Sequence, residues 1–245
     1  MKDRFSSGSQ LYQLARPSYP ASLIQEILKH VATPQFAWDC GAGSGQLTQL
    51  LAPHFDAVVA TDISAHQLQH APYFENVSYQ VQSAEHTSFA EQSFDLITVA
   101  QAIHWFDFDR FYAEVRRTLR PEGILAVIGY GLIHPQKPEL QGCIERLYFK
   151  TLKGYWDTEE AYQTIPFPFE EITTSELSMS FQWSAAQLLD YLNTWSALKH
   201  YRAKNSDDPL CEFKAFFTLD DHANQLFALK FPIFLRLGRL PVSAH

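Results

Sequence analysis

The sequence predicts an α/β protein with a seven-stranded, mostly parallel sheet, helices on both faces and a helical cap. Between residues 36 and 131, five short apolar runs alternate with amphipathic stretches, which is typical of successive βα units. Two further strand-like stretches follow at 172–183 and 231–238, and we expect the second to be the last, antiparallel strand. The length of 245 residues suits one large domain, so we expect a single domain over 1–245.

The five apolar runs are the expected parallel strands, and they cover residues 36–40, 57–63, 77–85, 94–101 and 123–131. A helix is expected over 23–31, after Pro20. Another should follow the fourth strand, because apolar residues from Phe108 to Leu119 recur at steps of three and four. Pro121 and Gly123 are expected to end that helix.

The chain divides into a ligand-binding core over 34–131 and a cap over 134–215 that includes one strand. Within and after the cap, helical patterns cover 184–201 and 207–230. Phe, Tyr and Trp make up 14% of the residues, a high share, and the surplus lies mainly in the cap. Aromatic side chains in a cap suit either its own core or a substrate pocket.

Composition narrows the function classes. The net charge of −8 and the lack of a Lys/Arg run argue against a nucleic-acid partner. No apolar stretch approaches the length of a membrane span, and the first twenty residues lack a signal-peptide core. Cys40, Cys143 and Cys211 form neither a CxxC motif nor a ligand set, so we expect no metal site and a reducing, cytoplasmic setting.

The stretch "GAGSG" places Gly41, Gly43 and Gly45 directly after the first strand, at the carboxyl edge of the sheet. Ligands of open α/β sheets bind at this edge, and glycine lets a ligand approach the backbone. The helix expected from about Gln46 would add free N–H groups for an anion. The stretch therefore predicts a ligand loop, with a tight βα turn that binds nothing as the alternative.

The residue at position 46 separates two ligand classes. The dinucleotide fingerprint GxGxxG requires a glycine there, whereas this chain has Gln46, which counts against an NAD-dependent oxidoreductase. The stretch "DCGAGSGQLT" at 39–48 instead resembles motif I of the class I S-adenosylmethionine (SAM) dependent methyltransferases. That resemblance implies a Rossmann-like fold with SAM as cofactor.

Later stretches resemble the same family in order. Asp62 ends the second strand, where an acid binds the ribose hydroxyls, although it could equally cap the helix starting at Ser64. "SAEHTSF" resembles the segment that meets the adenine, which implies that role for Ala84 and Glu85. "SFDLITVAQAIHWFD" resembles the motif facing the methionine half, and "RTLRPEGILAVIGYG" the helix, turn and fifth strand.

The resemblance thus implies a set of cofactor-binding residues at the ends of the first four strands. These are Asp39, Gly41, Ala42, Gly43, Asp62, Ile63, Ala84, Glu85, Ala100 and Gln101.

A narrower resemblance adds an N-terminal lid. "FSSGSQLYQLARPSYP", "AIHWFD" and "YLNTWSA" look like the trans-aconitate methyltransferase-like branch of proteins with a methyltransferase type 11 domain. The branch implies that residues 1–22 fold over the cofactor and bring Tyr12 and Arg16 towards the SAM carboxylate.

The function expected from the sequence is transfer of a methyl group from SAM to a small organic molecule, and the branch implies a carboxylate oxygen. His104 is the candidate catalytic base, or a residue that fixes its loop. Trp105, Tyr191 and Trp195 are candidate substrate contacts, or ordinary packing of the cap. A non-catalytic SAM-binding module and, less favoured, an NAD-dependent oxidoreductase are the alternatives.

Overall fold

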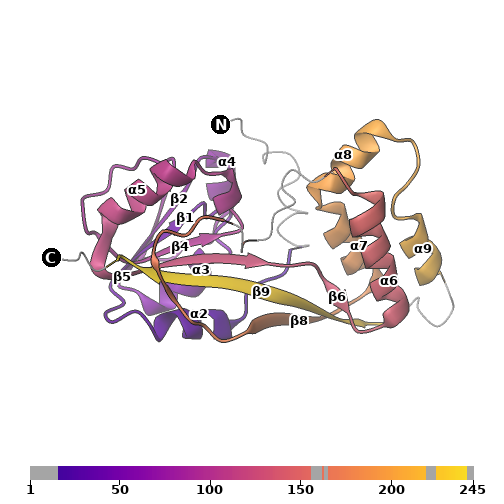
Figure 1. Ribbon diagram of the computed structural model, residues 1–245, viewed down its shortest axis with the longest axis horizontal. Helices are drawn as coiled ribbons and strands as arrows, with labels where there is room; N and C mark the ends of the chain where they lie inside the picture. The colour runs from indigo at the N-terminus through magenta and orange to yellow at the C-terminus, as the bar shows by residue number, and fades with distance from the viewer. Residues whose placement is uncertain (1–15, 156–161, 163–164, 219–224, 242–245) are drawn as a thin grey trace.

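The computed structural model describes residues 16–155, 162, 165–218 and 225–241. These residues form a mixed sheet of nine strands in the order β3-β2-β1-β4-β5-β9-β6, and β7 and β8 also pair with β9. Helices pack on the sheet and gather into a cap at one end of the molecule (Figure 1).

The strands follow the chain from the parallel half of the sheet to the antiparallel half. They are β1 (Phe36–Cys40), β2 (Ala57–Asp62), β3 (Val77–Val81), β4 (Phe94–Ala100), β5 (Leu119–Tyr130), β6 (His134–Pro135), β7 (Glu170–Ile172), β8 (Leu177–Trp183) and β9 (Phe227–Arg239).

The helices are short around the glycine turn and longer elsewhere. They are α2 (Ala21–Leu28), α3 (Thr48–Leu51), α4 (Ala65–Leu68), α5 (Phe108–Thr118), α6 (Pro138–Arg146), α7 (Ala185–Asn193), α8 (Ser196–Lys204) and α9 (Cys211–Phe217), with 3₁₀ turns at Ala52–His54 and Ile103–Trp105 and a π-helical turn at Leu147–Thr151.

Alternate residues of the central strands face opposite layers, as the two-residue period of a strand requires. In β5, Ile124, Ala126 and Ile128 belong to the core that contains α2, whereas Leu125 and Val127 belong to the core that contains α5. Figure 1 shows α2 and α5 on opposite sides of the sheet. The α/β fold with helices on both faces is therefore confirmed.

The antiparallel half is larger than the sequence predicts. Its centre is β9, which pairs with β5 and β6 along one edge and with β7 and β8 along the other. The expected strand over 172–183 is two strands, β7 and β8, and β6 was not expected at all. The sheet consequently has nine strands among the described residues, where seven were expected.

β9 also begins earlier than expected. The helix predicted over 207–230 is wrong from Phe227 onward, because Phe227, Leu229, Phe231 and Ile233 alternate with less buried residues and form the inner face of a strand. Only α9 represents that expected helix among the described residues. The antiparallel last strand itself is confirmed.

Two expected helices end differently. α5 stops at Thr118, whose hydroxyl donates to the carbonyl of Glu114 at 2.8 Å, and the chain enters β5 at once. Pro121 and Gly123 therefore lie within β5, beside a register shift against β4. The helix expected over 184–201 is broken at Thr194, whose hydroxyl bonds the carbonyl of Tyr191 at 2.6 Å.

The cap consists of α6 to α9, which lie together at the far end of the long strands β5, β8 and β9 (Figure 1). Its core is continuous with the α2 side of the sheet, because Leu188 and Leu198 belong to the same buried cluster as Ile24. Among the described residues, no helix combines the length and the apolar character needed to cross a membrane.

Candidate functional site

The glycine turn follows β1 and has a backbone that side chains rarely adopt. Gly41, Gly43 and Gly45 have φ angles of +70°, +55° and +77°. A Cβ atom on Gly41 would lie 2.6 Å from that of Ala102, and one on Gly45 would be crowded by Tyr79. A Cβ on Gly43 would meet, among the described residues, only the side-chain oxygen of Gln67 at 3.8 Å. Gly41 and Gly45 are thus required by packing, whereas Gly43 faces open space.

Asp62 at the end of β2 holds this turn. One carboxylate oxygen accepts from the N–H of Gly43 at 2.9 Å, and the other accepts from the N–H of Ser64 at 2.8 Å. The N-cap of α4 is Ser64, so the alternative role of Asp62 as that cap is wrong. The carboxylate therefore lies directly beside Gly43.

Asp39 lies in β1, just before the turn, and its side chain is buried. Its side chain is 1% exposed, and its two oxygens accept from the hydroxyls of Thr48 at 2.6 Å and Thr98 at 2.9 Å. Burial raises the pKa of Asp39 to about 6, although both hydrogen bonds act in the opposite direction. In this structure the carboxylate connects β1 to α3 and β4.

The next predicted residues line the edge beyond β2 and β3. Ile63 is 40% exposed, and Ala84 is buried. Glu85 accepts a hydrogen bond from the hydroxyl of Ser83 and another from the N–H of Asp107 at 3.2 Å. An apolar side chain, a small residue and a carboxylate therefore lie on the segments that follow adjacent strands.

The residue that follows β4 has a strained backbone. Ala100 is half-buried, and Gln101 has a φ of +54°, which is uncommon for a residue other than glycine. The N–H of Gln101 bonds the carbonyl of Ile128 in β5 at 3.0 Å. The 3₁₀ turn that follows carries His104 and Trp105, whose ring centroids lie 4.9 Å apart.

Arg16 lies on the β5 side of this edge. It donates to the hydroxyl of Tyr130 at 2.7 Å, and its guanidinium carbon lies 5.8 Å from the ring centroid of Tyr191 in α7. Arg16 thus joins the sheet to the cap. Tyr12 lies outside the described residues, as does most of the expected lid.

Sequence reasoning missed three tyrosines at this place, Tyr19, Tyr130 and Tyr162. The hydroxyl of Tyr162 donates to the side-chain oxygen of Gln101 at 3.2 Å, and its ring covers Gly129 so closely that a Cβ there would lie 2.5 Å away. Burial raises the pKa of Tyr19 well above its ordinary value, and Tyr130 and Tyr162 add to the shift. The available signal was Gly129, a glycine inside a strand, which often marks the close approach of another group.

The candidate substrate residues of the cap are largely covered. Tyr191 and Trp195 are 3% and 4% exposed, and their ring centroids lie 5.9 Å apart within an aromatic cluster that includes Phe231. Trp105 is half-buried. Tyr191 contacts Arg16, which lies at the site. Trp195 packs against Tyr148, with ring centroids 6.0 Å apart.

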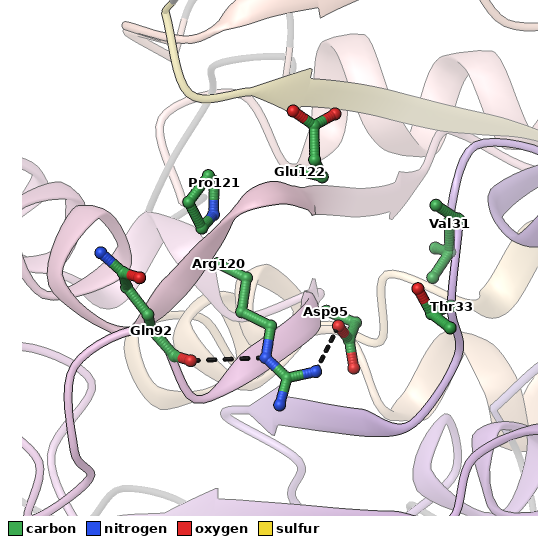
Figure 2. A pocket seen from close by; sticks show the side chains of 8 residues that line it. Val31, Thr33, Gln92, Asp95, Arg120, Pro121 and Glu122 are labelled. Atoms are coloured by element: carbon green, nitrogen blue, oxygen red, sulfur yellow. Dashed lines mark hydrogen bonds and ion pairs between the residues drawn. The ribbon is translucent and has the colours of Figure 1, made fainter.

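A cavity of about 400 Å³ lies elsewhere, at the amino ends of β4 and β5. Figure 2 shows Arg120 between Asp95 and Gln92 there, with its guanidinium donating to the Asp95 carboxylate at 2.6 Å and to the Gln92 carbonyl at 3.4 Å. Ligands of open α/β sheets bind at the opposite edge, where the glycine turn lies. Among the described residues, no cluster of three or more His, Cys, Asp or Glu side chains could hold a metal ion.

The carboxyl edge fits an adenosyl group on three structural grounds. In the part of the chain that the structure describes, the space in front of Gly43 is open, so a ligand can lie there against the main chain. Asp62 places a carboxylate beside that space, and such a group can accept from vicinal hydroxyls. Ile63 adds exposed apolar surface for a flat ring, next to the buried Ala84.

Comparisons with known proteins agree with this arrangement. A family model described as "Methyltransferase domain" matches residues 38–127. The chain is 33% identical over 250 residues to a Dictyostelium discoideum protein named "Putative methyltransferase", with 97% of this chain and 95% of that protein covered. It is 32% identical over 148 residues to a "Probable S-adenosylmethionine-dependent methyltransferase" of Saccharomyces cerevisiae, which covers 57% of this chain and 50% of the yeast protein.

One solved structure is similar over nearly the whole chain. It is described as "a Putative Type II Methyltransferase from Anaeromyxobacter dehalogenans" and superimposes with a TM-score of 0.85 at 37% sequence identity. The match covers 93% of this chain and 99% of the other.

Proposed function

Because this chain belongs to the class I, SAM-dependent methyltransferases, we propose that it methylates a small organic molecule bound at the carboxyl ends of β4 and β5. The observation that carries the proposal is Gly43, whose positive φ and open surroundings lie beside the Asp62 carboxylate. Membership of this family argues against the alternative function, that of an NAD-dependent oxidoreductase.

In this proposal the cofactor occupies the edge formed by β1, β2 and β3. The main chain of Gly41, Ala42 and Gly43 supports it, and Asp62 accepts from the ribose hydroxyls. Asp39 supports this turn indirectly, because its own oxygens already accept hydrogen bonds from Thr48 and Thr98.

The adenine would lie between the segments that follow β2 and β3, against Ile63, Ala84 and Glu85. Ala100 would border the methionine half, at the end of β4. Tyr12 and Arg16 were expected at the SAM carboxylate. Arg16 lies near enough to the end of β5 to serve either the cofactor or the acceptor.

When bound, SAM supplies a methyl carbon on a positively charged sulfur that departs with the bonding electron pair as the acceptor attacks. The protein's own contribution is alignment of the acceptor and exclusion of water. Trp105 and the ring of Tyr162 would shape the acceptor pocket, with Tyr191 behind Arg16 and Trp195 supporting Tyr191 from within the cap. No covalent nucleophile is required of the chain.

We propose a carboxylate oxygen as the acceptor atom, by resemblance to the trans-aconitate methyltransferase-like branch. A carboxyl group with an ordinary pKa of about 4 is already ionised at neutral pH, so no base is needed to remove a proton. His104 then serves as a hydrogen-bond donor or a loop support. For a hydroxyl or amine acceptor, His104 would instead be the base.

Titration calorimetry with SAM and S-adenosylhomocysteine tests the cofactor, with NAD as the negative control. Radiolabelled methyl transfer to a panel of carboxylates, phenols and amines then tests catalysis. We expect micromolar binding of both adenosyl ligands, no binding of NAD, and turnover of at least one carboxylate. Binding without any turnover would favour the alternative of a non-catalytic SAM-binding module.

The N-terminal segment is proposed as a lid over the site. Deleting residues 1–16 should leave a folded sheet but lower turnover, because few residues before Leu11 are apolar and the segment therefore has little core to bury. Full activity of the truncated enzyme would refute the lid.

A further inference from the structure

Gln101 carries a polar group that nothing else in the described structure explains. Its side-chain oxygen accepts from Tyr162, yet its side-chain nitrogen is buried and has no hydrogen-bond partner among the described residues. An unpaired buried amide N–H destabilises the folded protein, so such groups call for a specific explanation. The residue is also held at a φ of +54°, an arrangement that is retained mainly at functional sites.

Two hydrogen bonds of Gln101 are made with groups on the β5 side of β4. Its main-chain N–H bonds Ile128, and its side chain meets Tyr162, which lies on the next residue, Gly129. The glycine turn lies on the other side, because β1 and β5 flank β4 in the sheet. The side-chain oxygen of Gln101 is therefore held on the β5 side of β4, away from the glycine turn.

Other groups at the same end of β5, on the α2 face of the sheet, can donate hydrogen bonds. Tyr130, which follows Gly129, binds the Arg16 guanidinium at 2.7 Å. Burial keeps the hydroxyl of Tyr19 protonated by raising its pKa, and the ring of Tyr19 lies 6.3 Å from that of Tyr130. A cation and protonated hydroxyls favour a ligand atom that accepts hydrogen bonds and carries negative charge.

We propose that Gln101 is a specificity-determining residue for the acceptor: its side-chain N–H donates to an unprotonated, anionic oxygen of that molecule. Tyr162 is a positioning residue, because its hydroxyl binds the amide oxygen and thereby directs the NH₂ group towards the ligand. This inference rests on the proposed function and replaces the expectation that Gln101 binds the cofactor.

The test uses the full-length protein saturated with S-adenosylhomocysteine, with benzoate and benzylamine as probes. Both probes carry one flat ring that suits an aromatic pocket, but only benzoate offers an anionic oxygen. Calorimetry gives the two affinities. The side-chain amide signal of Gln101, identified by its loss in Gln101→Leu, is followed by NMR in protein labelled with ¹⁵N-glutamine.

We expect benzoate to bind more tightly than benzylamine and to shift the Gln101 signal. Gln101→Leu should weaken benzoate binding about tenfold or more, and Gln101→Glu at least as much, because a carboxylate repels the probe. Tyr162→Phe should weaken it about threefold to tenfold, and the Gln101→Leu/Tyr162→Phe double variant should be no weaker than Gln101→Leu.

Matched controls separate these effects from damage to the fold. Gln92→Leu alters another glutamine with a positive φ, of 51°, at the opposite edge of the sheet. Tyr112→Phe removes another buried tyrosine hydroxyl, which bonds the carbonyl of Pro166. Both should leave benzoate binding unchanged.

Failure of the proposed function would appear first, as wild-type protein that does not bind S-adenosylhomocysteine. With that ligand bound, several results would overturn the inference itself. The inference is wrong if benzoate does not bind, or if benzoate and benzylamine bind equally well. It is also wrong if Gln101→Leu loses affinity for S-adenosylhomocysteine while it keeps its affinity for benzoate. Additive losses in the double variant would remove the positioning role of Tyr162.

Discussion

The two halves of the carboxyl edge are built differently. At β1 and β2, the site consists of main chain and of residues close in sequence, from Asp39 to Ser64, with hydrogen bonds that fix a turn of glycines with positive φ. At β4 and β5, it consists of side-chain pairs from distant segments, Arg16 with Tyr130 and Gln101 with Tyr162, which only the fold brings together.

The difference explains how one chain can bind both a cofactor that the whole family shares and an acceptor that differs between family members. Main-chain recognition tolerates changes of side chain but not of backbone shape, so it suits a ligand that a whole family shares. Side-chain recognition changes with a single substitution, so it suits a ligand that differs between members. Variants of the first half should therefore lose cofactor binding, and variants of the second half should lose acceptor binding.

The largest effect is expected for Gly43→Val. A branched side chain would fill the open space at the turn, so the affinity for S-adenosylhomocysteine should fall more than about 100-fold by calorimetry. Gly154→Val is the control, because Gly154 has a φ of +77° and no described atom near its Cβ position. Both variants should lose about 1–2 kcal/mol of stability from backbone strain, and only the first should lose binding. Unchanged affinity in a folded Gly43→Val variant would sink the ligand-loop assignment.

Asp62→Asn is expected to weaken binding of the same ligand about 10- to 100-fold. The amide keeps one acceptor oxygen but removes the charge beside Gly43 and the second acceptor that holds Ser64. Asp56→Asn removes the same charge at an exposed position and should have no effect. If both variants bound equally well, Asp62 would be only a support for the turn.

The next prediction concerns Asp39, whose buried charge lowers the unfolding free energy in the absence of any ligand. Its folded pKa of about 6 lies above the unfolded value, so the unfolding free energy falls as the pH rises from about 4 to above 6. Asp39→Asn lacks this loss. Its stability relative to wild type should therefore increase by about 1–3 kcal/mol between pH 4 and pH 7.5, measured by urea unfolding. A difference independent of pH would contradict the raised pKa.

The smallest effect is expected for His104→Ala, in the second half. If the acceptor is a carboxylate, the methyl-transfer step should slow less than about tenfold and stay nearly flat from about pH 6 to 9, since general-base catalysis would contribute about 10²- to 10⁴-fold. Single-turnover transfer at saturating SAM measures this, with His54→Ala as an exposed control. A hundredfold loss with a rate that rises through an ordinary histidine pKa would make His104 the base for a hydroxyl or amine.

Local patterns were sufficient for the parallel half. Each of its strands is a short apolar run, and Gly41, Gly43 and Asp62 lie at fixed intervals from strand ends, so sequence order alone places them at one edge. The antiparallel half was predicted less well. In the sequence, no clear break separates the helical pattern over 207–230 from the alternation that starts at Phe227. The strand character of that alternation depends on pairing with β5 and β8, far away in the chain.

The fold class, the glycine turn and the family could be predicted without a structure, because they depend on local backbone preferences and on motifs in a fixed order. The contacts of Tyr162 with Gly129, of Arg16 with Tyr130 and of Gln101 with Ile128 became known only from the folded chain. Those contacts join residues up to 114 positions apart. The physical reason is that burial and hydrogen bonding between distant side chains depend on how the layers pack, which no local spacing encodes.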